Sequence, residues 1–337
     1  MRTPKSAATD SAPRADGQGR DRTALRIWKK GHVLSAEDTR AILRGGIERI
    51  TVARLEPGDI GEDAAAARLA AALVPGPAAA GLRLSDPFTG RVNINAAGPG
   101  LIELDVEAIH ALNAVDPGIT LATLAPFARV TAGQLVGTVK VVSYAVPKSA
   151  LEAACARGRG AFRLTPPRLR TAALILTTVP GQKPSLNEKG RAAVQYRLDA
   201  LEVGLIEVKD VPHETGAIAH ALAGVEADIA LILTGSATSD LHDTAPDALR
   251  RSGGAVNRFG MPVDPGNLLF TGTLRNGRPV IGLPGCARSP APNGADWVLE
   301  RLICGLPCGD EEISRMGVGG LLKESPGRPH SRERRGP

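Results

Sequence analysis

Aromatic residues are scarce in this sequence, where Phe, Trp and Tyr make up 3% of 337 residues. Proteins that bind single-stranded nucleic acid usually stack the bases on aromatic side chains, and this chain offers few of them. Its formal charge of +6 also comes from the two ends: residues 1–30 hold eight Lys or Arg against three Asp, and residues 323–337 hold five against two Glu. The middle of the chain is therefore close to neutral, and we expect no nucleic-acid partner.

Long apolar runs are missing as well. No segment approaches the roughly twenty apolar residues that a membrane-spanning helix needs, and the polar N-terminal segment lacks the apolar stretch of a signal peptide. The four cysteines are too few for a disulfide framework in a chain of this size. Cys304 and Cys308 have a spacing that a zinc site can use, but no second Cys or His pair follows them. We expect a cytoplasmic protein with reduced thiols and no membrane partner.

The chain divides into segments that differ in composition and in hydrophobic pattern. Residues 1–23 are polar and predict a disordered leader, and residues 323–337 predict a disordered basic tail. Residues 24–150 predict a small α/β element followed by a β-rich module. In the α/β element, Ser35 and Asp38 have the spacing of a helix N-cap pair, and residues 49–55 (RITVARL) predict a strand. The Pro- and Arg-rich stretch RLTPPRLR (163–170) predicts the connection to the next domain.

From residue 168 to 306 the pattern becomes regular. Apolar runs such as TAALILTTV (171–179) and ADIALILTG (227–235) alternate with helical segments. This alternation predicts an α/β domain with a parallel sheet that helices cover on both faces, and such sheets bind ligands at the carboxyl ends of their strands. The motifs of the commonest nucleotide-binding loops are missing: there is no P-loop, and the first strand runs into TTVPGQK instead of GxGxxG.

The stretch LILTGSATSDLHD (231–243) is the strongest candidate for a ligand-binding loop. Gly235 allows the chain to turn away from the sheet, and Ser236, Thr238 and Ser239 bring hydroxyl groups and backbone amides that suit a phosphate. Asp240 and Asp243 suggest contact with phosphate through a metal ion. The simpler interpretation is that Asp243 caps the following helix, in which Pro246 lies in the first turn.

Other candidates are weaker. The histidines at 110, 213, 220 and 242 show no spacing that would place two of them on one helix face for a metal. His242 attracts attention only because it is next to Asp243. Lys183 and Lys189 follow the first strand of the domain near the predicted ligand edge, where either could meet a phosphate, although exposed lysines rarely have so specific a role.

Two loops together suggest a family. The segments TGSATSDLHDTAPDAL (234–249), DPGNLLF (264–270) and GRPVIGLPG (277–285) occur in the order found in the molybdopterin-binding domain of molybdenum-cofactor biosynthesis proteins, which residues 168–306 resemble. The segment KKGHVLSAEDTRAILRGGIERITVARL (29–55) resembles, more loosely, the small modules that accompany this domain in the molybdopterin molybdotransferase branch. Ser236 stands where the family has a second glycine, and Cys286 and Ala287 stand where that branch usually has Asn-Pro.

The resemblance implies a three-layer domain that binds molybdopterin, with a magnesium ion at its phosphate or nucleotide. It assigns the metal and the catalytic role to Asp243. The ligand would be bound by residues of both loops, namely Thr234, Gly235, Ser236, Thr238, Ser239, Asp240, Gly282, Pro284 and Gly285. Leu283 belongs to the same turn.

Three functions remain open at this stage. The first is an enzyme of cofactor maturation, a molybdotransferase or nucleotidyltransferase acting on molybdopterin. The second is a non-catalytic carrier that hands molybdopterin or its nucleotide form to a molybdoenzyme or to another biosynthetic protein. The third is an α/β interaction domain whose glycine-rich loops are only turns. Relatives of this domain are commonly oligomeric, so we also expect a homo-oligomer.

Overall fold

The computed structural model describes residues 32–323, so the expected leader and nearly all of the expected basic tail lie outside the described residues. The chain forms two compact units, residues 1–54 and 55–337. In the described part of the first unit, helix α1 (Ala36–Arg44) begins after Ser35. The side chains of Ser35 and Asp38 each accept a hydrogen bond from the other's backbone N–H, which confirms the predicted capping pair.

The strand predicted at residues 49–55 is absent, since the structure assigns no strand between residues 47 and 56. Its sequence alternates as a strand does, and Ile50 and Val52 are 48% and 59% exposed. An extended segment becomes a strand only when a neighbour accepts its backbone hydrogen bonds, and no described residue supplies one here.

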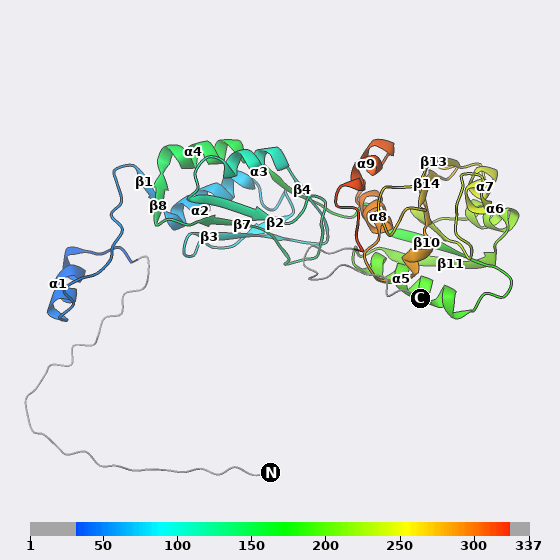
Figure 1. Ribbon diagram of the computed structural model, residues 1–337, viewed down its shortest axis with the longest axis horizontal. Helices are drawn as coiled ribbons and strands as arrows, with labels where there is room; N and C mark the ends of the chain where they lie inside the picture. Colours follow the sequence, from blue (N-terminus) through cyan, green and yellow to red (C-terminus); the bar gives the residue numbers. More distant parts are fainter. Residues whose placement is uncertain (1–31, 324–337) are drawn as a thin grey trace, which may run out of the picture. The chain divides into compact units, whose positions relative to one another are not determined.

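The first half of the second unit is the β-rich module that the alternating pattern predicts (Figure 1). Its helices are α2 (Glu62–Leu73), α3 (Val106–Asn113) and α4 (Lys148–Arg157). Its strands are β1 (Asp59–Gly61), β2 (Leu82–Leu84), β3 (Arg91–Ala96), β4 (Gly100–Leu104), β5 (Ile119–Thr123), β6 (Arg129–Val130), β7 (Leu135–Val141), β8 (Ala145–Pro147) and β9 (Phe162–Thr165). They form three small antiparallel sheets, ordered β1-β8, β2-β3-β7-β5 and β6-β4-β9.

This module continues beyond residue 150. Leu151 of α4 and Phe162 of β9 belong to its buried core, and β9 pairs with β4. The apolar residues of α4 and β9 therefore serve the core that precedes them in the chain, and the Pro-Pro sequence at 166–167 follows the last strand of the module.

The second half contains a six-stranded sheet in the order β11-β10-β12-β15-β14-β13. Its strands are β10 (Thr171–Thr178), β11 (Gly204–Pro212), β12 (Ile229–Leu233), β13 (Ala255–Phe259), β14 (Phe270–Thr273) and β15 (Pro279–Leu283). The helices are α5 (Ser185–Asp199), α6 (Thr215–Ala223), α7 (Thr244–Arg251), α8 (Gly294–Cys304) and α9 (Asp310–Ser314), with 3₁₀ turns η1 (Gly285–Arg288) and η2 (Arg315–Gly317). The predicted α/β character of this half is confirmed.

The sheet is mixed, which corrects the prediction of a parallel sheet. Strands β11, β10, β12 and β15 are parallel, whereas β14 is antiparallel to both β15 and β13. The reason lies in the length of the β14–β15 connection, which covers only residues 274–278. A parallel crossover needs a dozen residues or more, so a connection this short allows only an antiparallel hairpin.

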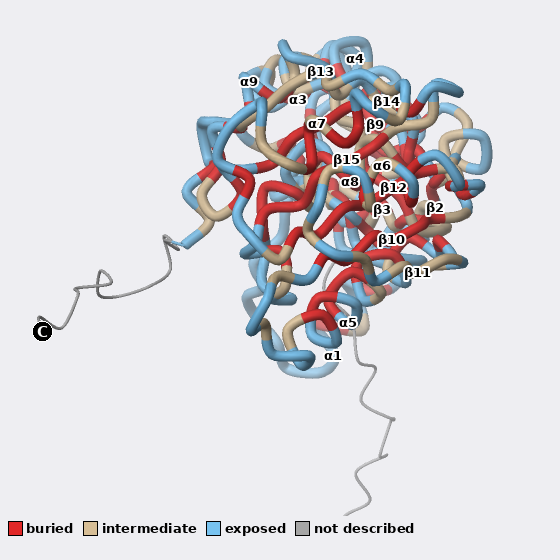
Figure 2. Tube along the Cα trace, turned by 90° about the vertical axis from the view of Figure 1, so that its right-hand side faces the viewer, coloured by how far each residue is buried: buried red, intermediate tan, exposed pale blue. Residues whose placement is uncertain are grey.

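Helices pack on both faces of this sheet. Leu174 and Leu176 of β10 share a core with residues of α5 and α8, while Ala173 and Ile175 share a second core with residues of α6 and α7. Figure 2 shows the corresponding buried segments along the central strands. Because β10 and β12 are buried on both faces, their sequences read as continuous apolar runs. None of the helices in residues 32–323 has the length and apolar character needed to cross a membrane.

Candidate functional site

The carboxyl ends of β10, β12 and β15 lie at one edge of the sheet, because these three strands are adjacent and parallel. The loops that follow them are in contact. The backbone N–H of Gly235 donates to Thr177 Oγ1 over 2.7 Å, and Arg288 Nη2 donates to the carbonyl oxygen of Thr234 over 2.8 Å. The structure therefore brings the predicted residues of the first loop together with the GLPG turn, as expected for a site at the strand ends.

Two of the three glycines that the resemblance singles out, Gly235 and Gly282, are required by close packing, whereas a Cβ on Gly285 would meet only Arg288 Nη1, at 4.0 Å. A Cβ on Gly235 would lie 2.4 Å from Gln182 Oε1 and 2.8 Å from the carbonyl oxygen of Thr177. A Cβ on Gly282 would lie 1.8 Å from the Phe270 ring. Gly282 is thus buried inside β15 and makes room for Phe270, which gives it a role in the core. Gly235 lies at the loop contact itself.

The hydroxyl and carboxyl side chains of the 234–243 loop differ in their exposure to solvent. Thr234 and Thr238 are buried, and Thr234 Oγ1 donates to the carbonyl oxygen of Ser236 over 2.5 Å. Ser236, Ser239 and Asp240 are exposed, as is Gly285 in the facing turn, whereas Pro284 is buried. The two threonines therefore shape the loop, and the exposed residues are the ones available to a ligand.

Asp243 occupies the N-cap position of α7, but its side chain does not cap the helix. Its Oδ2 accepts hydrogen bonds from the backbone N–H groups of Ser239, over 2.5 Å, and Asp240, over 3.2 Å. The carboxylate thus closes its own loop, and within residues 32–323 no hydrogen bond reaches its second oxygen, Oδ1. Asp240 Oδ1 accepts from the backbone N–H of His242, so this carboxylate also helps to shape the loop.

The described residues include no group of three or more His, Cys, Asp or Glu side chains that could hold a metal ion. Magnesium is commonly held by one or two carboxylates together with phosphate oxygens and water, so Asp243 Oδ1 fits this ion only in company with a phosphorylated ligand. Burial raises the pKa of Cys304 to about 12 and that of Cys308 to about 11, so both are protonated thiols in the metal-free protein.

Positive charge reaches the site from outside the 234–243 loop. A pocket of about 450 Å³ is lined by residues between 179 and 189, including Lys183 and Lys189, and by Gly235. Arg288 is half-buried beside it, and burial lowers the pKa of its guanidinium. Its Nε is buried with no hydrogen-bond partner, and no carboxylate of the described chain forms an ion pair with it. An anionic ligand would neutralise this charge through the accessible part of the guanidinium.

Thr177 and His213 also belong to the site, although little in the sequence distinguishes them. Thr177, fully buried at the end of β10, forms a hydrogen bond of 2.9 Å with Nδ1 of His213, which directly follows β11. A separate set of hydrogen bonds runs from Gln182 to Asn187 and from Asn187 to Asp210 of β11. The only signal available in the sequence was position, because His213 follows an expected strand at the end where ligands bind.

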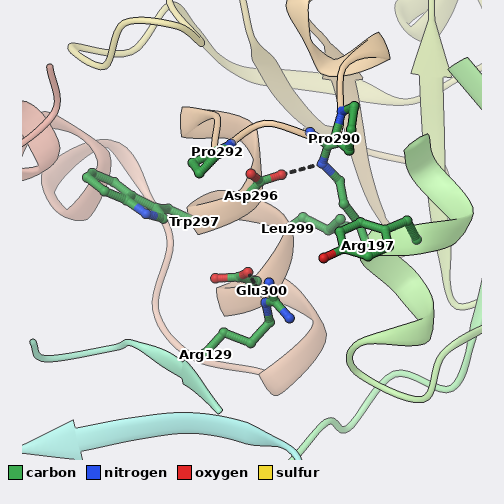
Figure 3. A pocket seen from close by; sticks show the side chains of 9 residues that line it. Arg129, Arg197, Pro290, Pro292, Asp296, Trp297, Leu299 and Glu300 are labelled. Carbon is green, nitrogen blue, oxygen red and sulfur yellow. Dashed lines mark hydrogen bonds and ion pairs between the residues drawn. The ribbon is translucent and has the colours of Figure 1, made fainter. Parts of the chain in front are cut away.

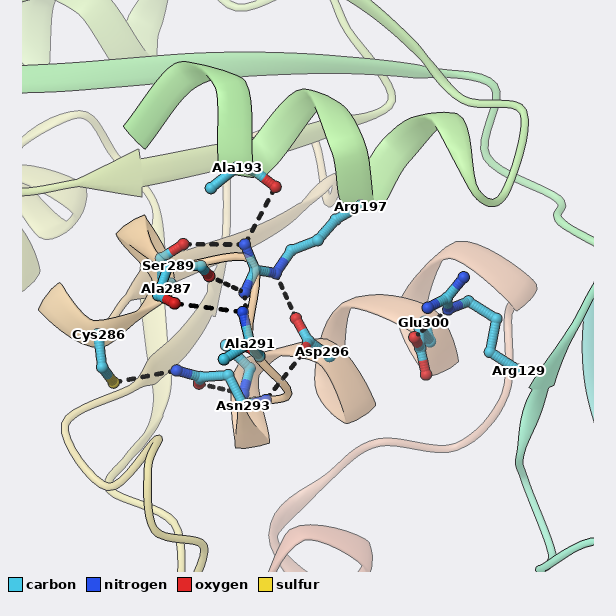
Figure 4. Close-up of polar contacts among 11 residues, drawn as sticks. Arg129, Ala193, Arg197, Cys286, Ala287, Ser289, Ala291, Asn293, Asp296 and Glu300 are labelled. Atoms are coloured by element: carbon cyan, nitrogen blue, oxygen red, sulfur yellow. Dashed lines mark hydrogen bonds and ion pairs between the residues drawn. The ribbon is translucent and has the colours of Figure 1, made fainter. Parts of the chain in front are cut away.

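The turn that carries Arg288 is held by Arg197 of α5 (Figure 4). The guanidinium of Arg197 donates to the carbonyl oxygens of Ala287, over 2.9 Å, and Ser289, over 2.8 Å, and also forms an ion pair with Asp296. Arg197 is 8% exposed. It is therefore the main polar anchor of the segment between β15 and α8.

A second pocket, of about 380 Å³, lies beside α8, where Arg129 meets Glu300 (Figure 3). Its charged side chains are paired with one another, Arg129 with Glu300 at 2.8 Å and Arg197 with Asp296. Burial raises the pKa of Glu300 to about 7, against the opposing effect of Arg129. The charges of this pocket are already balanced. An anionic ligand therefore gains less charge neutralisation here than in the strand-end pocket, where Lys183 and Lys189 have no ion-pair partner among the described residues.

Comparison with models of known protein families finds none that matches this chain, and no curated protein sequence matches it either. The class of protein that the structure defines is a mixed α/β protein with a candidate anion-binding edge at the carboxyl ends of β10, β12 and β15.

Proposed function

We propose that this protein binds molybdopterin, or its nucleotide form, at the edge formed by the loops after β10, β12 and β15, and that it acts in molybdenum-cofactor biosynthesis. The observation that carries the proposal is Arg288, a half-buried guanidinium that contacts Thr234 of the 234–243 loop and has no ion-pair partner among the described residues. Three-layer packing of the second half, as in the molybdopterin-binding family, is part of the proposal.

The chemistry of the pocket suits the phosphate end of this ligand. Arg288 and Lys189 supply positive charge, and the hydroxyl groups of the exposed residues Ser236 and Ser239 supply hydrogen-bond donors. Val179, Pro180 and Leu186 line the same pocket and offer apolar surface to the ring system. A pocket volume of about 450 Å³ also lies within the usual range for small-molecule sites, which is on the order of 300–1,000 Å³.

Asp243 is the residue that we propose to hold a magnesium ion, through its Oδ1. A bound magnesium would neutralise charge on the phosphate of the ligand. The loop around Asp243 would position that phosphate against Arg288, and this arrangement supports the enzymatic form of the proposal, a molybdotransferase or nucleotidyltransferase acting on molybdopterin.

A carrier function is the second candidate, and one observation favours it. The N–H of Gly235 already donates to Thr177, and Asp243 Oδ2 already accepts two backbone hydrogen bonds. These groups are committed to loop structure, which leaves fewer of them for stabilising charge in a reaction. A carrier would deliver molybdopterin to a molybdoenzyme or to another biosynthetic protein, and we propose that it does so in the cytoplasm, as a homo-oligomer.

Calorimetric titration under anaerobic conditions tests the proposal. Molybdopterin, free and adenylated, is titrated into the wild-type protein and into Arg288→Gln, with Arg315→Gln as a control because Arg315 forms only an exposed pair with Glu311. We expect micromolar binding by wild type and about tenfold or more weakening by Arg288→Gln, since a hydrogen bond to a charged group contributes about 1.5–3 kcal/mol. Absence of binding by the wild-type protein would overturn the proposal.

A further inference from the structure

A chain of hydrogen bonds crosses three neighbouring strand ends. His213 follows β11, Thr177 is in β10, and Gly235 follows β12. Thr177 Oγ1 accepts from the backbone N–H of Gly235 over 2.7 Å and lies 2.9 Å from His213 Nδ1. The backbone N–H of His213 donates to the carbonyl oxygen of Thr178 over 2.8 Å, which fixes the base of the side chain.

The proton positions in this chain follow from burial. Thr177 is fully buried, so its hydroxyl proton needs an acceptor inside the protein. The bond from Gly235 uses the hydroxyl as an acceptor, and His213 Nδ1 is the acceptor that remains within reach among the described residues. The hydroxyl therefore donates to Nδ1, and a neutral imidazole must then carry its proton on Nε2.

The Nε2–H group has no hydrogen-bond partner within residues 32–323. It is not deeply buried, because His213 is partly exposed at the strand-end edge. Thr177 joins the ring to Gly235 of the 234–243 loop through two hydrogen bonds. Burial lowers the pKa of His213, while the Asp243 carboxylate acts in the opposite direction. A donor with no partner among residues 32–323 thus lies at the same edge of the sheet as the 234–243 loop.

We infer that His213 is a ligand-binding residue whose Nε2–H donates a hydrogen bond to an acceptor atom of the bound molecule, while Thr177 holds the ring in the required tautomer. The inference rests on the proposed function, because it assigns a residue to that same site. The acceptor is a phosphate oxygen or a ring carbonyl oxygen, the two strong acceptors of a phosphorylated pterin. Thr177 thereby links the ligand contact to the position of the Gly235 loop.

The tautomer is tested without any ligand. Nitrogen-15 NMR of the imidazole distinguishes a protonated from an unprotonated ring nitrogen, and His213→Asn identifies the signal. We expect Nε2 protonated and Nδ1 unprotonated near pH 7.5, and Thr177→Val is expected to abolish this preference. Finding the proton on Nδ1 in the wild-type protein would overturn the inference, whether or not the protein binds a pterin.

The ligand contact is tested with two substitutions that separate the ring nitrogens. In His213→Asn, Oδ1 occupies the position of Nδ1 and can still accept from Thr177, but the Nε2 donor is lost. In His213→Gln, the side-chain amide nitrogen occupies the position of Nε2 and the Nδ1 acceptor is lost. Calorimetric titration with adenylated molybdopterin is expected to show about tenfold weaker binding by His213→Asn, and binding by His213→Gln closer to wild type.

The outcomes separate the two hypotheses. Wild-type binding with equal affinity in His213→Asn would overturn the role of Nε2 and leave the proposed function standing. If wild type does not bind at all, the proposed function fails. Loss of affinity in His213→Gln but not in His213→Asn would show that His213 acts only by holding Thr177, which also overturns the inference. Circular dichroism of each variant checks that the fold is retained.

Discussion

Replacement of Arg197 by methionine removes the anchor of the segment that follows β15. Methionine keeps much of the aliphatic stem but loses every donor, including those to Ala287, Ser289 and Ala291. It also leaves Asp296 without its ion-pair partner, in a position where the carboxyl side chain is 17% exposed. The change therefore leaves one carboxylate without its ion-pair partner and several carbonyl groups without their hydrogen-bond donor.

The structure sets the size of the effect. Removing one member of a buried ion pair costs about 3–5 kcal/mol. Asp296 keeps a hydrogen bond of 2.9 Å from the backbone N–H of Asn293, and the residues Ser289 and Ala291 are exposed enough for water to reach them. We therefore expect a value at the lower end of this range: the free energy of unfolding of Arg197→Met should be about 3 kcal/mol lower than that of the wild-type protein.

Urea unfolding followed by circular dichroism measures this loss. Arg191→Met is the matched control, because Arg191 lies on the exposed face of the same helix and its change should stay within about 0.5 kcal/mol. Adding Asp296→Asn to Arg197→Met should restore part of the free energy of unfolding, since the side chain without a partner is then uncharged. A loss for Arg197→Met no larger than that of Arg191→Met would refute the reasoning.

Three further predictions follow from the structure. The folded-state pKa of Glu300, about 7, lies above its ordinary value of 4.5, so its stabilising contribution is complete below pH 4.5 and disappears as the pH rises through 7. From pH 5 to pH 8, the free energy of unfolding measured in urea should fall by about 2 kcal/mol less for Glu300→Gln than for the wild-type protein. An equal fall in the two proteins would contradict this prediction. Gly235→Ala should cost about 1–3 kcal/mol in thermal unfolding and weaken molybdopterin binding, whereas Gly216→Ala, with open space around its Cα, should not destabilise α6. Asp243→Ala should reduce magnesium-dependent binding or turnover with α7 intact by circular dichroism, and unchanged magnesium dependence would remove its assigned role.

Much of the local structure could be predicted from the sequence. The apolar runs of β10 and β12 were recognisable because both faces of these strands are buried, and α1 was recognisable by the spacing of Ser35 and Asp38. Strand pairing was harder to predict, because it depends on partners distant in the chain. Residues 49–55 alternate as a strand does yet find no partner among the described residues.

For the candidate site too, the local part was predictable from the sequence and the contacts between distant segments were not. The loop at 234–243 was found from its own residues, since glycine, hydroxyl and carboxyl groups follow an apolar run. Arg288 and His213 could not be found in this way, because each comes from another strand end. Arg288 contacts Thr234 of the loop directly, and His213 is linked to the loop only through Thr177. Gly282 was assigned to the ligand, whereas the structure shows that it makes room for Phe270 in the core.

The most direct test of the account is a crystal structure of the protein grown and soaked anaerobically with adenylated molybdopterin and magnesium. We expect the pterin in the pocket beside Gly235, a phosphate oxygen within hydrogen-bond distance of the Arg288 guanidinium, and a magnesium ion at Asp243. Ligand density in the pocket between Arg129 and Trp297, or no density at any strand end in crystals of a protein saturated with the ligand, would contradict it.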